Sequence, residues 1–73
     1  MNYPQLVKIN YESFSAELIA TYNWTMDDLK EVIQETYGYQ PNKFELECNG
    51  NKVNNYDKLE NFKFPFEFSI CLI

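Results

Sequence analysis

Apolar and polar residues alternate with a period of two in two stretches near the N-terminus. Val7, Ile9 and Tyr11 alternate with polar residues, and the alternation resumes from Phe14 to Tyr22. This period is typical of strands that bury one face. The polar residues between the two stretches favour a turn, so the pattern predicts a hairpin over residues 6–22.

A helical pattern follows over Met26 to Tyr37. Thr25 and Asp28 have the spacing of a capping box, in which side chain and backbone of the first turn bond reciprocally. Gly38 occupies the position of a left-handed C-terminal cap, and Pro41 prevents the helix from resuming. The apolar stripe of this helix consists of Met26, Leu29, Val32, Ile33 and Tyr37.

The second half of the chain alternates again over residues 44–48. Asn49-Gly50 comes next, a strong hairpin signal because both turn positions accept positive φ, and residues 52–53 form a short return strand. Leu59, Phe62 and Phe64 predict a brief 3₁₀ turn near Leu59–Phe62 that closes one end of the core. Residues 66–73 alternate once more and predict a final strand.

This order of elements predicts an α+β fold with one domain over residues 1–73. The five strands form a mixed sheet, and the single helix covers one of its faces, which is the β-grasp architecture. A chain of 73 residues that is 45% hydrophobic has enough apolar side chains for one small core. No apolar run approaches the ~20 residues needed to cross a bilayer, and the N-terminus has no signal-peptide layout.

Charge and residue usage exclude several functions. The net charge is −5, the six basic residues are all lysine, and histidine is absent. A nucleic acid or an anionic membrane would be repelled, and the commonest general base and metal ligand is missing. The two cysteines do not make a zinc site, which needs about four ligands. We therefore expect no enzyme activity, no cofactor and no metal, and an intracellular (cytoplasmic or nuclear) protein with reduced thiols.

Other candidate sites have simpler interpretations. The helix column Asp27, Glu31 and Glu35 is interpreted as a solvated face near Lys30 and not as a cation site, because calcium needs about six to eight oxygens from a shaped loop. Glu12 and Glu17 are interpreted as a polar hairpin and not as a glycosidase pair. Cys71 is expected to be an ordinary outward-facing thiol and Cys48 a small core residue, too far apart for a disulfide.

The chain resembles the ubiquitin family over essentially its whole length. The segments that carry the resemblance are LVKIN, MDDLKEVIQETYGYQP, KFELECNGNKV and KLENFKFPFEFSICL. The resemblance implies protein binding through the outer face of the sheet, where Glu47 matches the central isoleucine of the ubiquitin recognition patch. The partner-binding residues predicted on this face are Lys8, Ile19, Glu45, Glu47, Cys71 and Ile73. Ile19 and Ile73, with Phe14 or Leu6 nearby, are the candidate apolar patch.

The departures from the family define the functional hypothesis. Conjugated members end in two glycines, whereas this sequence ends in Cys71-Leu72-Ile73, so we expect a non-conjugating interaction module. Its partners are proteins, with components of the ubiquitin–proteasome system among the candidates, although ordinary ubiquitin receptors would meet a carboxylate at Glu47. In isolation the domain is expected to be a monomer.

Three alternatives remain open. One is a modifier precursor with a glycine tail beyond Ile73. The second is a PB1-type domain, for which Lys8 matches the basic site but the acidic loop is absent. The third is a Ras-binding-type adaptor, which needs basic residues where the second strand carries Glu17.

Overall fold

The computed structural model describes residues 3–73 of the chain. Its helix begins and ends where the sequence predicts, and the 3₁₀ turn near Leu59 is also confirmed. A further 3₁₀ turn before the third strand is an addition to the predicted order. The elements are β1 (Pro4–Tyr11), β2 (Phe14–Thr21), α1 (Met26–Tyr37), η1 (Pro41–Lys43), β3 (Phe44–Cys48), β4 (Asn51–Lys52), η2 (Leu59–Asn61) and β5 (Phe66–Leu72).

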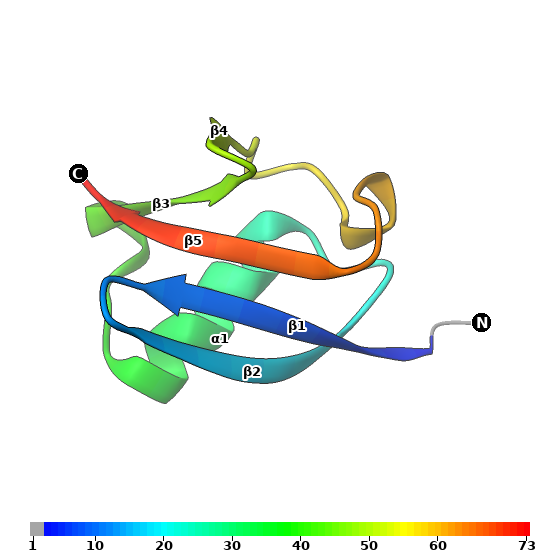
Figure 1. Ribbon diagram of the computed structural model, residues 1–73, viewed down its shortest axis with the longest axis horizontal. Helices are drawn as coiled ribbons and strands as arrows, with labels where there is room; N and C mark the ends of the chain where they lie inside the picture. Colours follow the sequence, from blue (N-terminus) through cyan, green and yellow to red (C-terminus); the bar gives the residue numbers. More distant parts are fainter. Residues whose placement is uncertain (1–2) are drawn as a thin grey trace.

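The five strands form one mixed sheet in the order β2-β1-β5-β3-β4. The last strand, β5, lies in the centre, where it runs parallel to β1 and antiparallel to β3. Helix α1 packs across one face of the sheet and leaves the other face open (Figure 1). The layers and the strand order agree with the predicted β-grasp arrangement.

The core lies between α1 and the inner face of the sheet. Val7 and Ile9 of β1 pair with Phe66 and Phe68 of β5, which places their side chains in two adjacent rows of this face. Burial of such side chains contributes roughly 1.5–3 kcal/mol each before the entropy cost. The buried apolar residues are Val7, Ile9, Ala20, Met26, Leu29, Ile33, Phe44, Leu46, Leu59, Phe66, Phe68 and Ile70.

The ends of α1 have the predicted caps. The backbone N–H of Asp28 donates to Thr25 Oγ1 at 3.2 Å, and the backbone N–H of Thr25 donates to Asp28 Oδ2 at 2.9 Å. Gly38 takes a left-handed conformation with φ of 80° and its N–H donates to the carbonyl oxygen of Gln34. The helix boundaries are therefore fixed by residues within or next to the helix.

Three side chains differ from the sequence prediction. Phe64 is 78% exposed and does not close the core, because the pairing of β1 with β5 begins at Val7 and Phe66, two residues after Phe64. Cys48 is half-buried, since it ends β3 beside a hollow. Lys30 is only 6% exposed although it was expected near a solvated helix face, because its ammonium reaches the carbonyl oxygen of Phe44.

Candidate functional site

The face of the sheet opposite α1, called the outer face below, carries the predicted site residues. Strand alternation directs every second side chain to this face. Lys8, near its centre, lies opposite Glu17 of β2 and opposite Glu67 of β5. The middle of the outer face is therefore a row of alternating charges.

Two polar interactions order side chains on the outer face. Asn10 Nδ2 donates a hydrogen bond to Glu67 Oε2, which joins β1 to β5. At the β3–β4 side of the outer face, Lys52 Nζ lies 2.8 Å from Glu45 Oε2. The hydrogen bond to Glu45, with the charge of that carboxylate, raises the pKa of Lys52 above its ordinary value of 10.5. Exposed ion pairs of this kind contribute little to stability because water and salt screen them, so this one orients side chains more than it stabilises the fold.

The six predicted residues occupy different parts of this region. Lys8 lies at the centre of the outer face. Glu45 lies opposite Cys71, and Glu47 lies opposite Ser69, so this group sits at the β3 side. Ile19 lies on β2 at the other side of the sheet. Ile73 follows β5, donates its N–H to Lys43 and lines a separate hollow of about 290 Å³.

The apolar patch predicted around Ile19 and Ile73 is not one surface. Ile19 and Leu6 are neighbours on the outer face, where they lie opposite each other in the β1–β2 ladder. Ile73 is seven residues beyond Phe66, which is level with Val7, and a rise of about 3.3 Å per residue places it roughly 23 Å along the sheet. The parallel direction of β1 and β5 thus separates the two isoleucines.

Phe14 also lies apart from the outer face. Its ring is 5.7 Å from that of Tyr11 and 6.2 Å from that of Tyr37, so it belongs to an aromatic cluster on the helix side of the sheet. The reason is alternation, because the even-numbered residues of β2 face α1. Of the two candidate neighbours of Ile19, Leu6 is the one that the fold supplies.

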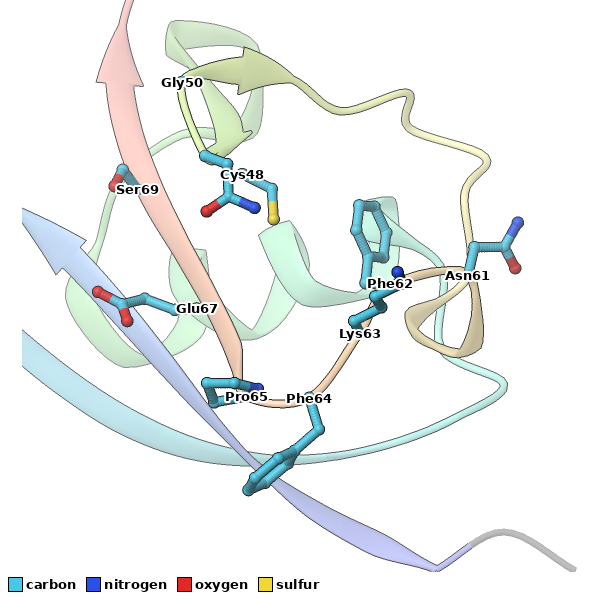
Figure 2. A pocket seen from close by; sticks show the side chains of 10 residues that line it. Cys48, Gly50, Asn61, Phe62, Lys63, Phe64, Pro65, Glu67 and Ser69 are labelled. Carbon is cyan, nitrogen blue, oxygen red and sulfur yellow. The ribbon is translucent and has the colours of Figure 1, made fainter.

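A hollow of about 570 Å³ opens beside the outer face where β3 ends. The β3–β5 ladder ends at the pair Glu47–Ser69, so the first residues of β5 lie beyond the end of that ladder. Figure 2 shows Cys48 and Phe62 on opposite sides of this hollow, with Phe64 turned away from it towards β1. The lining residues are Cys48, Asn49, Gly50, Asn61, Phe62, Lys63, Phe64, Pro65, Glu67 and Ser69.

The hollow has an aromatic wall that the core holds in place. The ring of Phe62 packs edge-on against the buried ring of Phe68, with centroids 5.1 Å apart, and its other side faces the hollow. Asn49, Asn61 and Ser69 supply polar groups around it. This combination of a fixed aromatic surface and polar rim suits an apolar side chain of a partner.

Sequence reasoning missed the hollow, although its aromatic residues stand out in the segment FKFPF over residues 62–66. The sequence predicts a closing turn from Leu59, Phe62 and Phe64. In the structure Leu59 is buried and Phe62 is half-buried. The hollow itself depends on the point at which β3 leaves β5. The pairing of β3 with β5 joins residues that are far apart in the sequence, so the local pattern of residues does not predict where it ends.

Outside the outer face and the hollow, the described residues give little indication of a catalytic or metal site. Cys48 and Cys71 are both free, as the sequence predicts. No group of three or more histidine, cysteine, aspartate or glutamate residues within 3–73 is placed to hold a metal ion. In the same range, no helix has the length and hydrophobicity that crossing a membrane requires.

Comparison with known proteins gave no match, either to the models of protein families or to curated proteins. The resemblance to the ubiquitin family therefore stays a prediction.

Proposed function

We propose that this domain is a protein-interaction module whose partner docks on the outer face and inserts an apolar side chain into the hollow beside Phe62. The observation that carries this proposal is the position of the hollow: Glu67 and Ser69 belong to both the outer face and the lining of the hollow. Protein interfaces combine a central apolar anchor with a polar rim, and the anchor supplies most of the binding energy.

The charges of the outer face indicate the chemistry of the partner. Four glutamates and two lysines point to this side of the sheet, so its charge is negative, as is that of the whole chain. A complementary partner carries lysine or arginine beside its apolar anchor, because opposite charges steer association and suppress wrong partners. The six charged residues are Lys8, Glu17, Glu45, Glu47, Lys52 and Glu67.

The test begins with a photo-cross-linking residue at Ser69, on the border of the outer face and the hollow. The cross-linked protein is identified, purified and titrated into the isotope-labelled domain, and amide shifts are mapped. We expect shifts around Glu47, Glu67 and Phe62 and few on the exposed side of α1. Glu31 on that side provides the matched position for charge reversal.

The matched variants are Glu47→Lys and Glu31→Lys, which make the same charge change on opposite sides of the molecule. Glu47→Lys should weaken binding at least about tenfold, since it repels a basic partner, whereas Glu31→Lys should change it less than about twofold. Shifts confined to α1, or equal effects of the two variants, would exclude the outer face. Non-conjugation, use by the ubiquitin–proteasome system and intracellular location stay predictions.

A further inference from the structure

The two edges of the sheet differ in their protection against pairing with another chain. β4 has two residues and carries Lys52, and a short edge with a lysine resists further pairing. β2 has eight residues, pairs with β1 at every one of them without a bulge, and contains neither lysine nor proline. On its other side β2 pairs with no strand of residues 3–73, and Figure 1 shows it along the lower border of the sheet.

The register of the first hairpin determines which backbone groups are free at this edge. Tyr11 and Phe14 flank a two-residue turn and form a hydrogen-bonded pair, after which bonded and non-bonded pairs alternate along the ladder. The even-numbered residues of β2 therefore direct their N–H and C=O groups to β1. The odd-numbered residues, including Glu17, Ile19 and Thr21, direct theirs to the free edge. The carbonyl oxygen of Thr21 already accepts the N–H of Trp24 at 3.1 Å, so the unpaired groups are those of Glu17 and Ile19 and the N–H of Thr21.

We propose that this edge pairs with the same edge of a second copy of the chain, antiparallel and about a two-fold axis at Ile19. Each Ile19 then lies opposite its counterpart, and each Glu17 lies opposite Thr21 of the other copy. Glu17 and Ile19 have outward backbone groups that can complete these hydrogen-bonded pairs, as does the N–H of Thr21. The carbonyl oxygen of Thr21, which accepts from Trp24, has a second lone pair for the N–H of Glu17 of the other copy. Residues that face each other have the same parity, which keeps both helices on the same side of a continuous ten-stranded sheet.

The strand is self-complementary in this register and less so in the neighbouring ones. An axis at Glu17 would place two carboxylates opposite each other, which is destabilising. An axis at Leu18 would place Glu17 opposite Ile19. The axis at Ile19 instead continues the apolar pair Leu6–Ile19 into the second copy, so four apolar side chains form one row across the interface.

The charge of the chain makes the dimer weak and salt-dependent. Each copy carries −5, so two copies repel at long range. At the edge itself, Lys8 lies opposite Glu17, the one carboxylate on β2, and compensates its charge. Salt screens the repulsion between the remaining charges, whose range is about 8 Å at physiological ionic strength. Five paired residues per copy bury less than the ~1,200 Å² typical of stable complexes. The domain is then a monomer when dilute, as the sequence predicts, and associates reversibly when concentrated.

The first experiment measures association and amide exchange of the whole chain from about 20 μM to about 2 mM. Sedimentation velocity should show a dimer that grows with concentration and with salt. Hydrogen exchange should show concentration-dependent protection of the amides of Glu17, Ile19 and Thr21. A chain that stays monomeric, a dimer that salt dissolves, or protection at another surface would overturn the proposal.

A matched pair of variants separates the edge from the face. Ile19→Lys and Leu6→Lys make the same change at two outer-face residues of similar exposure, 56% and 54%, but Leu6 is one strand further in. Ile19→Lys should weaken association at least about tenfold, and Leu6→Lys only about two- to threefold. Both sites are exposed, so both variants should keep the native amide spectrum. Equal weakening by both would contradict pairing at the edge.

Cysteine cross-linking tests the register in a background of Cys48→Ala and Cys71→Ser. Ile19→Cys should form an intermolecular disulfide, because a hydrogen-bonded pair places the two Cα atoms about 5.5 Å apart, within the range of a disulfide. Glu17→Cys should not, because the two positions are offset by four residues, about 13 Å. Faster cross-linking of the second variant would exclude the axis at Ile19. These readouts concern self-association alone, so they can fail independently of the proposed partner site.

Discussion

Lys30 Nζ donates a hydrogen bond to the carbonyl oxygen of Phe44 at 3.1 Å and lies 5.4 Å from the centroid of the ring of the same residue. One residue of β3 thus provides both an oxygen and a π-face to a lysine of α1. The lysine is buried although Asp27 and Glu31, the acidic residues nearest to it on the helix, are exposed. This contact joins the helix to the strand that borders the candidate site.

Replacement of Lys30 tests how much of its contribution to stability comes from packing of the side-chain stem and how much from the polar contact. Lys30→Met keeps the length and the apolar stem and removes the cost of burying an ammonium, so the free energy of unfolding should change by less than about 1 kcal/mol or rise. Lys30→Ala also removes the stem and should cost about 2–4 kcal/mol. Urea unfolding of the three proteins measures both. A loss from the methionine variant as large as that from alanine would show that the polar contact dominates.

Gly38 tests the left-handed end of α1. Its φ is 80°, and a Cβ added there would meet no atom within 4 Å, so substitution strains the backbone without a clash. Gly38→Ala should therefore destabilise the fold by about 1 kcal/mol. Gly38→Asn should cost less, because asparagine tolerates this conformation better than alanine. Thermal unfolding compares the two, and equal losses would argue against backbone strain as the cause.

The alkaline limit of stability should depend on Tyr11 and Lys52. Partial burial, followed by the charges of Glu12 and Tyr39, raises the pKa of Tyr11 above 10.0, and Glu45 raises that of Lys52 above 10.5. The folded chain then holds protons that the unfolded chain has lost, so stability is present below about pH 10 and falls as pH rises through the folded values.

The double variant Tyr11→Phe with Lys52→Gln removes both groups and should flatten this decline. Urea unfolding at several pH values from about 9 to about 11.5 measures the slope. A slope as steep as that of the parent chain would assign the alkaline loss to other groups. The single variants show which of the two contributes more.

The two thiols should differ in reactivity with a thiol reagent under native conditions. Cys71 is exposed and Cys48 is half-buried, and both are free, so Cys71 should react first and Cys48 more slowly. In denaturant the two thiols should react equally fast. The mass of the untreated chain should not change on reduction, because the chain contains no disulfide to reduce. Slower reaction of Cys71 would contradict its position on the outer face.

Sequence and structure agree best where the information is local. Thr25, Asp28 and Gly38 cap α1 within one stretch of the chain, so the predicted boundaries are those observed. Asn49 and Gly50 take positive φ of 54° and 82° in the turn between β3 and β4, as their residue types predict. Local backbone preferences and hydrogen bonds suffice to decide such features, because the residues involved are close together in the sequence.

The remaining features were decided by the tertiary structure. The burial of Lys30 depends on where Phe44 comes to lie, and the exposure of Phe64 depends on where the ladder of β1 and β5 begins. The distance between Ile19 and Ile73 follows from the parallel direction of two strands that are far apart in sequence. By itself, the sequence determined the helix and the order of the five strands, the inward and outward alternation, the fold class and the charge of the molecule. Pairing across strands decided which outward residues became neighbours, because register aligns residues that no local pattern connects.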